Sequence, residues 1–248
     1  MTEAALFAFL LVFVRASAML LVAPLFGATN VPLPVRILTT LSIAGALTVA
    51  IRPRMGPMPA TMHDLVVSVL IEAGAGLLLG GMVSLAMQAL AIAGSLMDLQ
   101  TGLSTSQVLN PISGVSSSVL SQLKTMLGLV VFLAADAHHL LLAAFVRSYD
   151  AVPTFARIHD ALVPLVGKTF LLGIQIAAPV MAVGFLVDAS LALVSRAVPT
   201  IQPTQLGVPA KLLAGILAVT VGLPTVVVAV SSAVHMGLQA ASGAFGHA

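Results

Sequence analysis

The sequence LVVSVLIEAGAGLLLGGMVSLAMQALAIAGSLM (Leu65–Met97) runs directly into DLQTGLSTSQVLNPISGVSSS (Asp98–Ser118). At about 1.5 Å per residue, a helix over the first stretch would be roughly 50 Å long, whereas the hydrocarbon core of a bilayer is only about 30 Å thick. The second stretch is rich in Ser, Thr, Gly, Asn and Gln, a composition that favours turns and backbone hydrogen bonding. An overlong apolar helix followed by a polar internal segment is therefore the feature that any fold must accommodate.

The overall composition places the chain in a membrane. Of its 248 residues, 59% are hydrophobic and 7% are charged, and the mean hydropathy is +1.14, whereas a soluble domain has about 25% charged residues. Most side chains must therefore contact lipid or other subunits. The net charge of +2 comes from scattered residues, which argues against nucleic-acid binding. The absence of cysteine excludes disulfides and thiolate sites.

Six apolar segments separated by polar or proline-rich breaks predict an all-α, polytopic helical membrane protein, with several segments broken or bent at glycine or proline. We interpret the first as a retained helix rather than a cleaved signal, because no Lys or Arg precedes it and Glu3 lies where a positive charge is expected. The segments are Ala4–Phe26, Val31–Ile51, Leu65–Met97, Met126–Val146, Leu162–Leu193 and Leu206–Val234.

Glycines in the overlong segment allow two interpretations. Gly74, Gly76, Gly80 and Gly81 offer points at which the helix could break. The spacing of Gly76 and Gly80 also matches the small-xxx-small pattern, which lets another helix approach closely. We favour packing as the role of these glycines.

Six ionisable residues lie within or beside the apolar segments, and each would cost about 3 kcal/mol at a helix centre facing lipid. We therefore expect them to face protein or water. A proton pathway is one interpretation, but only Glu72 and Asp188 lie deep and no relay pattern repeats, so hydrogen-bonded packing is favoured. Lys211 is expected to contact acidic or carbonyl groups of a neighbouring subunit, or else to snorkel to lipid headgroups. The six residues are Arg15, Glu72, Asp98, Asp136, Asp188 and Lys211.

No catalytic or metal-binding pattern is present in the sequence. His138 and His139 are adjacent, so on a helix they point about 100° apart and cannot readily share one ion. There is no His-Glu-x-x-His spacing, no phosphate-binding glycine loop with lysine and no serine in a nucleophile-elbow pattern. We therefore expect no enzyme activity, no cofactor and no bound metal.

A set of prolines, glycines and polar residues recurs along nearly the whole chain in a characteristic order and approximate spacing: Pro24, Pro32, Arg36, Glu72, Gly76, Gly80, Gly94, Gln100-Thr101-Gly102-Leu103-Ser104, Pro111, Phe132-Leu133, His138, Ser148, Pro153, Pro199 and Val208-Pro209. In this order and spacing the chain resembles the FliR family of the flagellar type III protein-export apparatus. It departs from the family at Thr101, Asn110 and Asp136, where relatives often carry methionine, aspartate and asparagine.

The resemblance implies a place in an assembly. One copy of the chain would join several copies of FliP and FliQ in a helical export gate, associated with FlhB, in the bacterial inner membrane at the flagellar basal body. Unfolded export substrates would pass through the gate, and lipid would contact part of its surface. Residues 1–161 would form a FliP-like helical part that includes the polar segment 98–118, and residues 162–248 a FliQ-like helical hairpin with a C-terminal tail.

The resemblance also implies that the polar segment plugs the pore, with residues 110–118 as the plug itself. A protein-export channel must pass an unfolded chain yet stay closed when idle, and Ile112 and Val115 would supply apolar contacts inside a narrow pore. A solvent-exposed connector is the alternative. The candidate plug residues are Gln100, Gly102, Asn110, Pro111, Ile112, Ser113, Gly114, Val115 and Ser116, and the candidate packing and assembly residues are Gly76, Gly80, Glu72 and Lys211.

Two other functions stay open at this point. A virulence type III secretion gate would share the same motifs, so the sequence patterns do not separate it from a flagellar one. A secondary transporter for a small solute would show two corresponding halves with broken helices around a midplane site, and no such repeat is visible.

Overall fold

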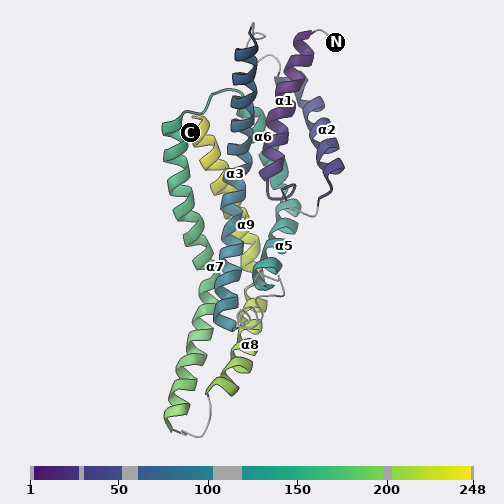
Figure 1. Cartoon of the computed structure of the whole chain (residues 1–248). Coiled ribbons are helices and arrows are strands. Elements are labelled where there is room, and N and C mark those ends of the chain that lie inside the picture. The colour runs from purple at the N-terminus through teal and green to yellow at the C-terminus, as the bar shows by residue number, and fades with distance from the viewer. Residues whose placement is uncertain (1–2, 28–30, 52–60, 103–118, 198–202, 247–248) are drawn as a thin grey trace. The chain divides into compact units, whose positions relative to one another are not determined.

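The chain is almost entirely helical in the part that the computed structural model describes, which comprises residues 3–27, 31–51, 61–102, 119–197 and 203–246 (Figure 1). No strand occurs in these ranges, so the all-α prediction is confirmed. The helices are α1 (Glu3–Val22), α2 (Leu33–Ile51), α3 (Met62–Thr101), α5 (Val119–Ala134), α6 (Ala137–Arg147), α7 (Phe155–Ala197), α8 (Pro203–Val221) and α9 (Leu223–Phe245).

Five of these helices are long and apolar enough to cross a membrane, namely α1, α2, α3, α7 and α9. The number rises to six if α5 and α6 together count as one broken span. By the length and composition of its helices, the chain is a multi-pass membrane protein, as the sequence predicts.

Two of the six predicted segments are each divided into two helices. The segment Leu206–Val234 breaks at Gly222, between α8 and α9, and Pro224 is the second residue of α9, as expected for a break at glycine or proline. The segment Met126–Val146 breaks instead at Asp136, which adopts a left-handed φ of 53°. Because neither glycine nor proline marks this second break, the sequence pattern did not predict it.

Helix α3 has no break from Met62 to Thr101, so the glycines inside it are not break points. Thr61 begins the helix: its hydroxyl accepts a hydrogen bond from the Asp64 amide at 3.1 Å and donates one to the Asp64 carboxylate at 2.7 Å. Gly102 ends it with a φ of 79°, the left-handed conformation that a helix-terminating glycine adopts without steric cost.

The chain divides into two compact units. Unit 1 comprises Met1–Ala86, Leu133–Gly167 and Val234–Ala248. In it, α1 and α2 lie side by side (Figure 1), and α1 packs closely against the first part of α3. A Cβ at Gly76 would overlap the Arg15 carbonyl oxygen, and one at Gly80 would overlap that of Met19, whereas Gly74 has open space around it.

Unit 2 comprises Met87–Phe132 and Lys168–Ala233. Helix α5 buries one stripe at helical spacing, and this stripe packs on the second part of α3, where a Cβ at Gly128 would overlap the Leu90 side chain. The buried stripe consists of Leu120, Lys124, Gly128 and Phe132.

Candidate functional site

The segment between α3 and α5 is described at its two ends. Gln100 lies in the last turn of α3 and Gly102 follows that helix, so both precede the segment. The remaining predicted plug residues lie outside the described residues; they are Asn110, Pro111, Ile112, Ser113, Gly114, Val115 and Ser116. The end of α3 and the start of α5 form the base of the segment.

Asp98 joins the two ends of this segment. Its carboxylate is buried, and its two oxygens lie 3.0 Å and 3.3 Å from the Leu120 amide nitrogen, which donates a hydrogen bond. The first amides of a helix have no partner within that helix, and a carboxylate also offsets the partial positive charge there. Asp98 thus caps α5 from α3 and holds the chain on either side of residues 103–118 at a fixed separation.

Close backbone packing also holds the end of α3 against the start of α5. A Cβ at Gly94 would overlap the backbone of Ser121, so α3 and α5 touch there without a side chain between them. The Ser121 hydroxyl donates a hydrogen bond to the Ala91 carbonyl oxygen at 3.1 Å. The base of the segment is therefore closely packed on the side where α3 faces α5.

A second polar group connects the end of α3 to α7 and α8. The Lys211 ammonium lies 2.6 Å from one oxygen of Asp188, and the Gln100 amide donates to the other at 3.4 Å. Gln100 lies against Gly184 of α7, where a Cβ would overlap its side chain. A contact between Lys211 and a neighbouring subunit was expected. In the structure Lys211 forms an ion pair with a carboxylate of its own chain.

Thr101 completes the contacts at this end of α3. A Cβ at Gly215 of α8 would overlap its methyl group, so the two helices approach closely there. The three consecutive residues Gln100, Thr101 and Gly102 therefore have distinct positions: one over α7, one over α8 and one ending the helix.

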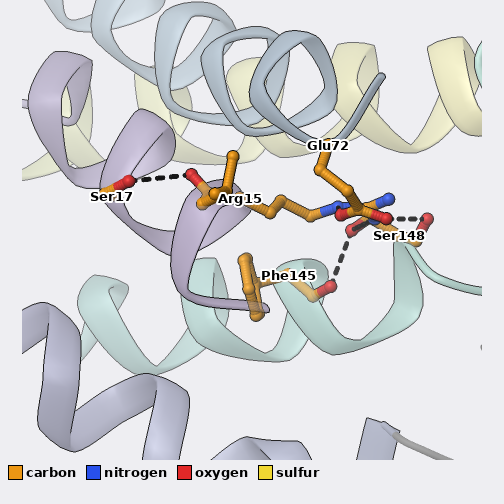
Figure 2. A network of polar contacts seen from close by, with 6 residues as sticks. Arg15, Ser17, Glu72, Phe145 and Ser148 are labelled. Carbon is orange, nitrogen blue, oxygen red and sulfur yellow. Dashed lines mark hydrogen bonds and ion pairs between the residues drawn. The ribbon is translucent and has the colours of Figure 1, made fainter. Parts of the chain in front are cut away.

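Unit 1 contains a separate buried cluster around Arg15, which Figure 2 shows extending from α1 toward Glu72 and Ser148. The Arg15 Nε lies 2.5 Å from a Glu72 carboxylate oxygen. Its Nη1 donates to the Ser148 carbonyl oxygen at 3.0 Å and to the Ser148 hydroxyl at 2.8 Å, and that hydroxyl donates to the Phe145 carbonyl oxygen at 2.7 Å. The guanidinium carbon lies 3.7 Å from the centre of the Tyr149 ring.

This cluster gives Glu72 a structural explanation. Its carboxylate is paired with a guanidinium that has further acceptors of its own, which is how a buried ion pair is made tolerable. Burial raises the pKa of the Tyr149 phenol, so the ring stays neutral beside Arg15. The arrangement ties α1, α3 and the turn after α6 together, and it favours packing over proton transfer as the role of Glu72.

Sequence reasoning identified these charged residues but missed their partners. Ser148 and Tyr149 are separated from Arg15 by more than half the chain, and no spacing rule connects them. The only available signal for Asp98 was its position, where an apolar segment gives way to a polar one.

Comparison with known proteins gives one family. The model of bacterial export proteins, family 1, matches residues 6–236 of the chain. The chain is 37% identical over 177 residues to the flagellar biosynthetic protein FliR of Caulobacter vibrioides, a match that covers 69% of this chain and 70% of the relative. It is 34% identical over 187 residues to the FliR of Bacillus subtilis, with 71% and 70% covered. It is 26% identical over 176 residues to the FliR of Escherichia coli K12, with 68% and 66% covered.

Proposed function

The chain belongs to the FliR family of bacterial export proteins and is a subunit of the flagellar type III export apparatus. We propose that residues 110–118, within the polar segment 98–118, close the export channel at rest. The hydrogen bond from the Leu120 amide to the Asp98 carboxylate carries this proposal. A segment whose two ends are joined by a buried carboxylate can change its own shape without unwinding the helices that flank it. A plug needs this property, because it must move aside when an exported chain passes and then close the pore again.

The composition of the segment suits a plug better than a connector in contact with lipid. Backbone outside helices is tolerated at membrane depth only where it is buried in protein or lines a water-filled cavity. Ile112 and Val115 would make apolar contacts inside a narrow pore, and Gly114 and its neighbouring serines would permit close packing. A protein-export channel needs such a reversible seal, because an open pore wide enough for a chain would leak ions.

Asp188 and Lys211 provide a route by which the hairpin could influence the plug. Their ion pair is partly exposed to solvent, and such pairs contribute only about 0–1 kcal/mol. Breaking it is therefore cheap, and it would leave Asp188 in contact with Gln100 but no longer with α8. We place the trigger for opening at this contact, where α7 and α8 meet the end of α3.

The assembly that this function requires is part of the proposal. The chain would combine with FliP, FliQ and FlhB in the inner membrane at the basal body, with residues 1–161 as a FliP-like part and residues 162–248 as a FliQ-like hairpin. Large apolar side chains along α7 are exposed in the isolated chain, which supports coverage by neighbouring subunits or lipid. They include Phe170, Leu171, Phe185, Leu186 and Leu193. In this assembly the chain has a structural and gating role, not a catalytic one.

The relatives favour flagellar export over the two alternatives. The relatives from three organisms are named as flagellar proteins, which separates this chain from a virulence secretion gate. Membership of an export-protein family argues against a self-contained transporter of small solutes.

A deletion within the segment tests the gating proposal. Removing Ile112 to Ser117 should leave the complex assembled, as measured by co-purification, and should raise the resting permeability of the cells to ions. A second variant with Ile112→Ser and Val115→Ser keeps the length of the segment but removes its apolar contacts, and it should leak in the same direction.

The two variants distinguish a seal from a connector. If the complex is intact and permeability stays at the wild-type level in both variants, the segment is only a connector. A leak in the deletion variant alone would assign the seal to the length of the segment and contradict the role of the two apolar side chains.

A further inference from the structure

The break between α5 and α6 brings together one carboxylate and two imidazoles. Asp136 immediately precedes α6, and His138 and His139 lie in its first turn. Their candidate ligand atoms all lie within 4.8 Å of one another, and the two imidazole rings are 4.1 Å apart between centroids. The wide separation expected of adjacent helical histidines is therefore not what the structure contains.

Asp136 is held in an unusual position and is not used as a helix cap. In the described ranges it is the only residue other than glycine with a positive φ, a conformation that costs roughly 1 kcal/mol. An aspartate before a helix normally accepts a hydrogen bond from the first free amides, but Asp136 makes no such side-chain bond. Its carboxylate instead lies 3.3 Å from Nδ1 of His139.

His138 has a ring nitrogen without a protein partner. Its Nδ1 is buried and accepts or donates no hydrogen bond within the part of the chain that the structure describes. An unsatisfied buried polar atom costs about 1–3 kcal/mol. Among the described residues no protein group engages this nitrogen, and one nitrogen of the same ring lies within 4.8 Å of the candidate ligand atoms of Asp136 and His139.

We propose that Asp136, His138 and His139 bind one divalent transition-metal ion of the Zn²⁺, Ni²⁺ and Cu²⁺ class. Two imidazoles and a carboxylate form a donor set that suits these ions, whereas Mg²⁺ and Ca²⁺ prefer oxygen alone. The Asp136 and His139 side chains are 75% and 68% exposed, so an ion can enter from solvent and water can complete its coordination. The carboxylate offsets the partial positive charge at the start of α6, which would otherwise oppose a cation.

The exposure of Asp136 and His139 also limits the surroundings in which the break between α5 and α6 can lie. A charged or strongly polar side chain facing hydrocarbon is costly, so the turn between two apolar helices must face water or another subunit. In either position a bound ion would hold the left-handed turn at Asp136 in place and define how α6 begins.

Zn²⁺ binding to the purified full-length chain tests the proposal, with the chain prepared without a histidine tag and together with the subunits that co-purify. Equilibrium dialysis followed by metal analysis should give one Zn²⁺ per chain. His139→Gln should weaken binding by at least about tenfold, and Asp136→Asn should weaken it in the same direction. Both side chains are exposed, so neither replacement removes a core contact.

His159→Gln is the matched control. His159 also pairs with a neighbouring carboxylate, that of Asp160, at 3.3 Å in an exposed position, but no third donor accompanies it among the residues that the structure describes. This variant should bind Zn²⁺ as the wild type does. With Cu²⁺ as the probe, electron paramagnetic resonance should report two imidazole nitrogens in the wild type and one in His139→Gln.

Two results would overturn the proposal. One is a wild-type chain that binds no Zn²⁺ above the level of nonspecific background. The other is equal binding by wild type and His139→Gln, which would place the ion elsewhere on the protein.

Discussion

Replacing Glu72 with alanine should destabilise the protein by about 3 kcal/mol, because it leaves the Arg15 charge buried without its carboxylate. The side chains of Arg15 and Glu72 are 6% and 12% exposed, so solvent cannot take over the missing interaction. Breaking a buried ion pair by removing one partner costs about 3–5 kcal/mol. In this variant Arg15 keeps the two Ser148 acceptors and the Tyr149 ring. The expected loss of stability is therefore at the lower end of that range.

A double variant separates the loss of pairing from the loss of packing. Replacing both charges with apolar groups of similar size, as in Arg15→Met with Glu72→Leu, should recover most of the stability, because a buried ion pair and an apolar pair are often nearly equivalent. Asp188→Ala is the control. Its side chain is 45% exposed and that of Lys211 is 26% exposed, so losing this pair should cost only about 0–1 kcal/mol.

Thermal unfolding of the detergent-purified chain, followed by circular dichroism, provides the comparison. Glu72→Ala should unfold well below the wild type, while the double variant and Asp188→Ala should unfold close to it. Equal effects of Glu72→Ala and Asp188→Ala on the unfolding temperature, or a double variant as unstable as Glu72→Ala, would show that the Arg15–Glu72 pair does not have this role.

Two further substitutions test contacts within each unit. Gly80→Leu should impair assembly, because any side chain there meets the Met19 backbone, whereas Gly74→Leu enters open space and should assemble normally; equal recovery of the complex with both variants would contradict this. Lys211→Ala should slow secretion of flagellar substrates into the medium, because it removes the ion pair through which α8 acts on Asp188 and Gln100, and Lys211→Arg should keep the wild-type rate; a wild-type rate in Lys211→Ala would remove this contact from the mechanism.

The fold class was predictable because the composition leaves few alternatives. A chain with so few charged residues cannot cover a soluble surface, and in lipid its backbone must satisfy its own hydrogen bonds as helices. The same requirement explains why α3 continues through its glycines. Breaking the helix there would expose backbone groups in apolar surroundings, whereas a continuous helix lets α1 pack against Gly76 and Gly80.

The break at Asp136 and the polar contacts could not be predicted from local patterns. Aspartate adopts the left-handed conformation only occasionally, so its presence between two apolar runs does not mark a turn. Hydrophobic periodicity shows which residues are buried but not which helices meet. The contacts from Asp98 to Leu120 and from Arg15 to Ser148 therefore required the three-dimensional structure.

The conductance of the reconstituted complex in planar bilayers tests most directly whether the segment between α3 and α5, whose ends Asp98 joins, seals the channel. Asp98→Leu removes the acceptor for the Leu120 amide, while Asp98→Asn keeps one side-chain oxygen in the same place. With intact complexes, we predict a raised resting conductance for Asp98→Leu and a conductance close to that of the wild type for Asp98→Asn. An intact Asp98→Leu complex that is as tightly closed as the wild type would contradict the central claim.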